Sequence, residues 1–249
     1  MKAILSLAAA VLALSLGCSG SGDGSGARDA EFYYSLAVNY FYDQNSQQAL
    51  RELTSCFAID PDHVQAHNLA GLIYLGRKEY ADALTHLRTA VEKAPGFLDA
   101  RANLGAVLIE MQDWTGAIAE LTPLARDPLY STPYLVENNL GYAYFKLGKL
   151  QEAETHLKRA VFLNDNLCLG FNNLGMLHLE QGRAEDALDA FDAAIKRCPG
   201  YPEPYFHAGA LLEESARVKE AAGRYEKCVK IGGESVFARR CQRKLQALR

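Results

Sequence analysis

The side chains best suited to chemistry in this sequence are six cysteines and six histidines, and neither set forms a catalytic or metal-binding pattern. His63 and His67 are four residues apart, a spacing that suits a metal ion on a helix, but no carboxylate or cysteine completes a ligand set. The sequence has no glycine-rich phosphate loop, no nucleophile elbow and no redox CxxC pair. We therefore predict that the chain has no catalytic residue, no metal ion, no cofactor and no small-molecule substrate.

The composition indicates a folded protein whose main partner is not a nucleic acid. Of 249 residues, 49% are hydrophobic, which is enough to build a sizeable apolar core. The formal net charge is -4 at pH 7, whereas binding to a phosphate backbone needs a dense basic surface. We expect the partner to be another protein.

A six-fold repeat sets the positions of these residues. Two small-residue series recur with steps of 34, 34, 36, 34 and 34 residues: Ala37, Gly71, Gly105, Gly141, Gly175 and Gly209, and Ala49, Ala83, Ala117, Ala153, Ala187 and Ala221. A period of about 34 residues is the length of one helix–turn–helix unit that must stack on copies of itself to bury its apolar face. The spacing therefore predicts an all-α solenoid.

The residues within each period resemble the tetratricopeptide repeat family. Leu104-Gly105 and Leu140-Gly141 match its first-helix pattern, Ala83 and Ala153 its second, and a proline such as Pro199 follows the second helix. The resemblance implies a right-handed superhelix of six units over residues 30–63, 64–97, 98–133, 134–167, 168–201 and 202–235, followed by a capping helix over 236–249.

The single step of 36 residues marks an irregular segment. Pro123 falls inside the second helix of the third unit, and residues 127–133 form a longer connection. Proline removes a helix hydrogen bond and clashes with the preceding turn, so we predict a shortened or kinked helix followed by a long loop.

Both ends of the solenoid differ from its middle. The first unit is rich in aromatic residues, which either form an exposed docking patch or pack on Ile59 and the next unit. The last segment is basic and lacks acids, which predicts a polar cap, with a basic contact surface as the alternative.

The resemblance also implies a partner-binding groove, because first helices line the concave face in this family. An asparagine amide both donates and accepts hydrogen bonds, so it can pair with a partner's backbone, or it can tie helices together within the scaffold. Aromatic and apolar side chains beside the amides would act as anchors. The predicted groove residues are Tyr34, Phe41, Asn68, Leu72, Asn103, Asn138, Asn139, Tyr142, Asn172, Asn173 and Phe206.

Four cysteines fall where this repeat scheme brings helix ends together. Cys168 opens the first helix of the fifth unit and Cys198 ends its second helix, so a disulfide there would join the two. Cys228 and Cys241 flank the junction with the capping helix and could pair in the same way. Cys56 occupies a small-residue core position, which indicates a buried thiol.

The N-terminus resembles that of a bacterial lipoprotein. Residues 3–16 are apolar or small and too short to span a bilayer, which is typical of a signal peptide. Gly17-Cys18 then resembles the lipobox, although Ser15 stands where that motif usually has leucine. The resemblance implies cleavage after residue 17, a lipid on Cys18 and a flexible tether over 18–29. Ordinary signal cleavage with an unmodified Cys18 is the alternative.

A narrower resemblance combines these features. A lipobox-like start, six units and the stretch from Leu124 to Tyr130, followed by Val136-Glu137-Asn138-Asn139, resemble the type IV pilus biogenesis lipoproteins called pilotins, the Tgl, PilF and PilW family. The resemblance implies anchoring in the outer membrane facing the periplasm, with the pilus secretin as partner. The alternative is an adaptor lipoprotein that gathers periplasmic envelope enzymes.

Overall fold

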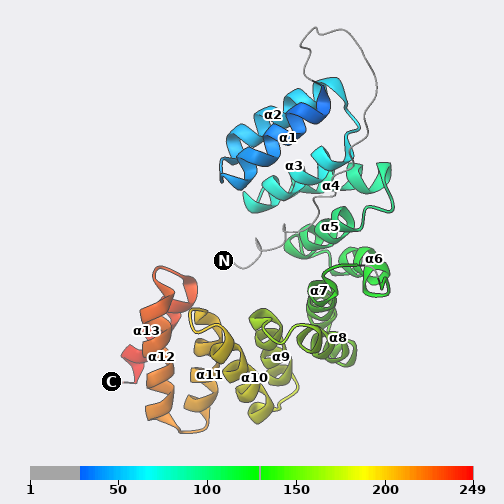
Figure 1. The fold of residues 1–249 in the computed structure, drawn as a ribbon. Coiled ribbons are helices and arrows are strands. Elements are labelled where there is room, and N and C mark those ends of the chain that lie inside the picture. The colour runs from blue at the N-terminus through cyan, green and yellow to red at the C-terminus, as the bar shows by residue number, and fades with distance from the viewer. Residues whose placement is uncertain (1–28, 129, 249) are drawn as a thin grey trace.

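The computed structural model describes residues 29–128 and 130–248, and within them it contains thirteen α-helices and no strand (Figure 1). The helices are α1 (Ala30–Tyr42), α2 (Ser46–Ile59), α3 (Val64–Gly76), α4 (Tyr80–Lys93), α5 (Leu98–Glu110), α6 (Trp114–Ala125), α7 (Pro133–Lys146), α8 (Leu150–Leu163), α9 (Cys168–Glu180), α10 (Ala184–Arg197), α11 (Pro202–Glu214), α12 (Val218–Gly232) and α13 (Val236–Ala247).

Consecutive helices pack as six pairs, α1 with α2 through α11 with α12, and the pairs follow one another along an arc (Figure 1). The first helices also contact one another along the stack, α1 with α3, α3 with α5, α5 with α7 and α7 with α9. We call the face formed by these first helices the inner face. The final helix α13 packs on both α11 and α12, which is the position of a further first helix. The predicted all-α fold of six helix pairs is confirmed.

The recurring small residues are explained by close helix approach. A Cβ at Gly141 on α7 would lie 2.6 Å from Cγ of Leu157 on α8, and one at Gly209 on α11 would lie 2.6 Å from Cε1 of Tyr225 on α12. Both facing side chains are fully buried. Each contributes about 1.5–3 kcal/mol by leaving water. A larger residue at these glycines would push the two helices of a unit apart.

The irregular segment between α6 and α7 places one described residue, Tyr130, in the core. α6 has 12 residues, whereas α4 and α8 have 14, so the predicted shortening is confirmed. Pro123 lies in its last turn and Pro133 begins α7. Within this segment Tyr130 is 8% exposed and belongs to the cluster that contains Leu124. Burial raises the pKa of the Tyr130 hydroxyl.

The turn inside each unit contains one residue with positive φ. These residues are Gln44, Lys78, Gln112, Gly148, Gly182 and Ala216, and they recur with the steps of the repeat. Glycine adopts this left-handed conformation without strain, whereas a Cβ makes it unfavourable. Only the fourth and fifth units use glycine there.

Disulfide bonds join the same two cysteine pairs that the repeat scheme places together. Cys168 at the start of α9 is bonded to Cys198 after α10, with Cα atoms 6.0 Å apart. Cys228 on α12 is bonded to Cys241 on α13, with Cα atoms 6.3 Å apart. Cys56 is a buried thiol whose pKa burial raises to about 11, so it is a poor nucleophile at neutral pH.

The N-terminal features fall outside the described part of the chain. The predicted signal peptide over 1–17, the predicted lipidation site Cys18 and all of the predicted tether except Asp29 lie in residues 1–28. Among the helices that are described, none is long and apolar enough to cross a membrane.

Candidate partner-binding surface

Four of the predicted groove asparagines are hydrogen-bonded to one another across neighbouring units. Nδ2 of Asn103 on α5 donates to Oδ1 of Asn68 on α3 at 2.9 Å. Nδ2 of Asn173 on α9 donates to Oδ1 of Asn138 on α7 at 2.9 Å. A hydrogen bond of this kind contributes about 1 kcal/mol net. The amides therefore help to fix the spacing of adjacent first helices, which is the scaffold role considered for them.

Burial divides the predicted groove residues into two groups. Asn138, Asn172 and Asn173 are 2%, 1% and 7% exposed, so in this structure they are not accessible contact residues. The residues that remain half-buried and reachable from the inner face are Tyr34, Phe41, Asn68, Leu72, Asn103, Asn139 and Tyr142.

Phe206 is a core residue and not a groove anchor. It lies on α11 and is 7% exposed. The guanidinium of Arg240 on α13 lies 4.0 Å from the centroid of its ring, and the ring of Phe237 lies 5.9 Å away. The helix α13 covers this position because it packs against α11 as a seventh first helix would. Its basic residues thus serve the cap, at least at Arg240 and at Lys244, which pairs with Glu213 at 3.1 Å.

The first unit leaves part of its aromatic surface open. Four of its rings pack against the buried core of the first two units, which contains Ala37 and Leu69. These rings are Tyr33, Tyr34, Tyr40 and Phe41. Phe32 and Tyr42 are 42% and 60% exposed, and Ile59 is 51% exposed, so the outer rings are not buried on that isoleucine. The first unit therefore has both rings that pack into the core and rings that are exposed to solvent.

A polar cluster on α9 and α11 was not predicted from the sequence. Tyr201 Oη donates to Glu203 Oε2 at 2.8 Å, and His207 Nε2 lies 3.8 Å from Glu203 Oε1. Burial raises the pKa of Glu203, but hydrogen bonds from His207, Tyr201 and Asn172 outweigh it, and the net shift is downward. Burial and the adjacent carboxylate raise the pKa of Tyr201. Glu203 is thus held ionised beside Asn172, and Tyr201 lies near Tyr142; both Asn172 and Tyr142 are predicted groove residues.

A second unpredicted residue is Glu137 on α7, which is fully buried. Its Oε2 accepts a hydrogen bond from His156 Nδ1 at 2.6 Å, and its Oε1 lies 3.0 Å from Nε of Arg159, both on α8. The ring of His156 stacks on Tyr144 with centroids 5.2 Å apart. A lone glutamate in an apolar helix gives no sequence signal of such pairing, since its partners come from the next helix.

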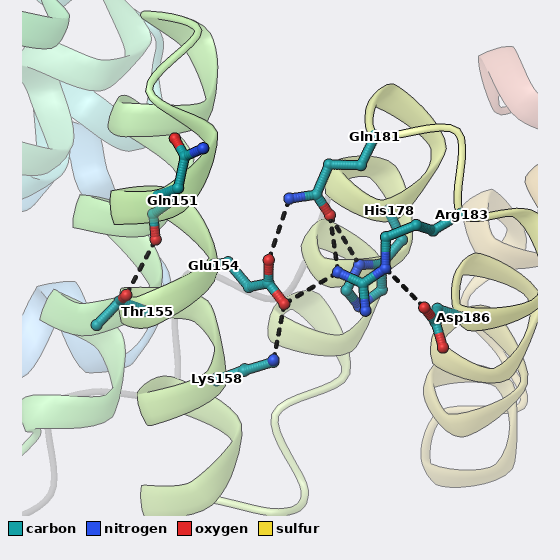
Figure 2. A network of polar contacts seen from close by, with 8 residues as sticks. All are labelled: Gln151, Glu154, Thr155, Lys158, His178, Gln181, Arg183 and Asp186. Carbon is teal, nitrogen blue, oxygen red and sulfur yellow. Dashed lines mark hydrogen bonds and ion pairs between the residues drawn. The ribbon is translucent and has the colours of Figure 1, made fainter.

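A polar network joins the fourth and fifth units on the side of the second helices (Figure 2). Glu154 on α8 accepts from Lys158 at 2.7 Å, from Gln181 at 3.0 Å and from Arg183 at 3.1 Å, and Arg183 also pairs with Asp186 at 2.7 Å. The hydrogen bonds from Lys158 and then Gln181 outweigh burial and lower the pKa of Glu154 to about 2. The network therefore stays charged at neutral pH and links the two units.

The described residues offer no metal site: nowhere in 29–128 or 130–248 do three His, Cys, Asp or Glu side chains come together as a ligand group.

The arrangement of helix pairs agrees with a comparison of the sequence with known protein families. One tetratricopeptide repeat model matches residues 34–96, 138–202 and 172–229, and a second tetratricopeptide repeat model matches 74–134. The chain belongs to the tetratricopeptide repeat family.

Several tetratricopeptide proteins are similar to this chain. A crystal structure of PilW, described as a widely conserved type IV pilus biogenesis factor, superposes with a TM-score of 0.77 at 20% identity, covering 86% of this chain and 98% of that one. The type IV pilus assembly protein PilF of Pseudomonas aeruginosa is 28% identical over 140 residues, 56% of this chain and 55% of PilF. A BBSome complex member BBS4 homolog of Drosophila melanogaster is 26% identical over 193 residues, 75% of this chain. The chain thus spans 55% of the length of PilF and 38% of the length of the BBS4 homolog.

Tetratricopeptide units form protein-binding scaffolds, and the geometry fits that role. The reachable inner-face residues combine apolar rings with asparagine amides whose spacing is fixed by hydrogen bonds between units. Such a surface can hold an extended protein segment by apolar contacts and by backbone hydrogen bonds.

Proposed function

We propose that this chain is an outer-membrane lipoprotein that binds the type IV pilus secretin on its inner face and promotes assembly of secretin multimers. The observation that carries the proposal is the 28% identity to the pilus assembly protein PilF. The fold of PilW, a pilus biogenesis factor, matches almost end to end and supports it.

The proposed mechanism is tethered assembly. A lipid on Cys18 would hold the chain at the periplasmic side of the outer membrane, and the tether over 18–29 would let the solenoid reorient. Single acyl chains bind membranes only weakly, so stable anchoring needs more than one chain. Holding a secretin segment close to the membrane raises its effective concentration where the ring forms. Pilus formation and twitching motility would then depend on this chain.

The anchor is tested by replacing Cys18. Cells that lack the gene would be complemented with the native chain or with the Cys18→Ala variant, and secretin multimers would be followed in separated inner and outer membranes. We expect the variant to accumulate as a folded protein and the secretin multimers to leave the outer membrane. Normal outer-membrane multimers in the variant would contradict the proposal.

The inner face is tested with a charge placed among its apolar residues. Leu72→Glu on α3 should reduce secretin binding, because the charge interrupts the apolar contact. The control is Thr85→Glu on the exposed side of α4, which should bind normally. Binding of purified secretin periplasmic domains to the native chain and to each variant would be measured by calorimetry. Binding to peptidoglycan hydrolases in place of the secretin would favour the envelope-enzyme adaptor.

A further inference from the structure

The asparagine pairs that link neighbouring first helices are interrupted between the fifth and sixth units. In both pairs the acceptor precedes the donor by 35 residues, as in Asn138 and Asn173. Asn172 stands at the acceptor position of the next interface, but the donor position there holds His207. Asn172 is 1% exposed, and its Oδ1 has no hydrogen-bond partner among the described residues. A buried acceptor without a donor is unfavourable, so this interface lacks a donor that the other two have.

The imidazole of His207 is directed at a carboxylate. His207 Nε2 lies 3.8 Å from Oε1 of Glu203, and Tyr201 Oη donates to Oε2 of Glu203 at 2.8 Å. Asn172 is hydrogen-bonded to the same carboxylate, so its amide lies beside Glu203. Burial raises the pKa of Glu203 but these hydrogen bonds lower it further, and the carboxylate is ionised at neutral pH.

The negative charge of Glu203 is not balanced by a basic side chain. α9 contains one glutamate and α11 contains three, and neither helix contains a lysine or an arginine. Glu213 pairs with Lys244, whereas no lysine or arginine of the described chain forms an ion pair with Glu203. His207 supplies a positive charge only if it is protonated. A carboxylate accepts up to about four hydrogen bonds, so Glu203 can accept from a further donor.

Glu203 can be reached from the inner face. Its side chain is 26% exposed, although it lies beside the buried Asn172. Contact between successive first helices extends from α1 to α9 and is less extensive between α9 and α11. Met176 follows Asn172 by four residues, so it lies on the same face of α9, and it is half-buried. The surface therefore combines an ionised carboxylate, an amide oxygen without a donor and an apolar side chain.

We propose that Glu203 and Asn172 form a cation site for a lysine or arginine side chain of a partner segment lying along the inner face. The ammonium or guanidinium group donates to Glu203 and to the amide oxygen of Asn172, and its methylene groups pack on Met176. The site therefore selects basic segments over neutral ones. This inference rests on the proposed function only in that the inner face holds a protein segment, whichever protein supplies it.

The test is a double-mutant cycle on peptides selected by the full chain. A random peptide library would be selected on the native chain, and binding of the selected peptides would be measured by fluorescence anisotropy. We expect these peptides to share a lysine or arginine, and its replacement by norleucine should weaken binding about tenfold. Glu203→Gln should cause the same loss, and the two losses should not add, because both remove one contact. This variant should fold, since Gln65 occupies the equivalent position in the second unit.

Glu214→Gln is the matched control, because it makes the same change of charge at an exposed position of α11. Its effect should simply add to that of norleucine. Selection of no peptides, selection of peptides without a shared basic residue, or additive losses for Glu203→Gln would overturn the proposal. Peptides with only apolar residues in common would assign the inner face to an apolar segment.

Secretin binding separates this inference from the proposed function. Secretin domains that bind the native chain and Glu203→Gln equally would overturn the cation site and leave the proposed function standing. Coupling between Glu203 and the peptide's basic residue, without any binding of secretin domains, would contradict the proposed function alone.

Discussion

The first three units, α1 to α6, and the last three, α7 to α12, follow one repeat but are fixed by different means. The second half, together with α13, has both disulfides, the buried Glu137 and the Glu154 network of Figure 2. The first half has the free thiol Cys56 and no disulfide among its described residues, whereas asparagine pairs and ring contacts occur in both halves. The repeat therefore sets where helices lie, whereas residues outside its pattern set how firmly they are held.

The difference is sharpest between the second and fourth units, which place a histidine at the same position of the second helix. In the fourth unit, His156 Nδ1 pairs with the carboxylate of Glu137 at 2.6 Å. In the second unit, His86 Nδ1 faces His67 Nδ1 at 2.9 Å, and His67 occupies the position of Glu137. Both histidines stack on a tyrosine, Tyr144 or Tyr74. One exchange of partner turns an ion pair into a pair of imidazoles.

Reduction of the disulfides should change the stability difference between the two halves more than any other treatment. Cys168 and Cys198 are separated by 30 residues, and Cys228 and Cys241 by 13. The loop-entropy model gives about 3–4 and about 3 kcal/mol for closures of these lengths. Amide exchange with and without reductant should show lost protection in α9 to α13 and little change in α1 to α6. Thiol titration of the unfolded, unreduced mature protein should find one thiol, Cys56; five would mean that neither bond forms.

Replacing the two equivalent histidines should give the next largest effect, with a greater loss of stability in the fourth unit than in the second. His156→Ala leaves Glu137 buried with Arg159 as its remaining partner and should cost about 2–3 kcal/mol. His86→Ala is the matched change, and it removes a neutral hydrogen bond and a ring stack worth about 1–2 kcal/mol. Urea unfolding at pH 7 measures both losses. A larger loss for His86→Ala would show that the buried carboxylate does not distinguish the two units.

The helix pairs of the scaffold could be predicted from the sequence, whereas the contacts between side chains of different helices could not. The spacing from Ala37 to Gly209 predicted six helix pairs because the small residues that allow close approach recur at every turn of the solenoid. Pro123 predicted the short α6 for a local reason, the missing backbone donor. Both are properties that a residue has within its own unit.

The site could be predicted only in part, since accessibility depends on neighbouring units. Asn138 and Asn173 have the same residue type and unit position as Asn68 and Asn103, yet the first two are buried and the second two are half-buried. Phe206 is covered because α13 follows it in space, which the pattern of its own unit does not show. Side-chain pairs between helices, such as Glu137 on α7 with His156 on α8, also depend on how the two helices are aligned in three dimensions.

Lowering the pH should affect the second unit before the fourth. Burial and then His67 lower the pKa of His86, against a smaller opposite effect of Asp82. His67 Nε2 donates to the carbonyl of Pro61 at 2.9 Å, so its Nδ1 accepts the hydrogen bond from Nδ1 of His86. The folded state therefore binds fewer protons than the unfolded state, and stability falls as the pH drops below the ordinary histidine value of about 6.5.

Amide exchange of α3 and α4 between pH 7 and pH 5 measures this loss. The Glu154 network has a depressed pKa of about 2, so its contribution is lost only as the pH falls through about 4.5 toward that value. The double variant His67→Glu with Thr89→Arg copies Glu137 and its partner Arg159 into the second unit and should make the stability of α3 and α4 less dependent on pH. Equal loss in α3 and α7 for the native chain would remove the proposed difference.

Substitutions in the turn inside a unit should give the smallest effect, with opposite signs in the third and fourth units. Gln112 in the third unit has a φ of 62°, and Gly148 in the fourth has a φ of 72°. Gln112→Gly removes the Cβ strain and should stabilise the chain by about 0.5 kcal/mol, because the greater freedom of unfolded glycine offsets part of the gain. Gly148→Ala introduces the strain and should cost about 1 kcal/mol. Gln242→Gly within α13 is the control and should destabilise, since glycine is unfavourable inside a helix. Urea midpoints that shift in the same direction for Gln112→Gly and Gly148→Ala would show that turn strain is not what distinguishes these two units.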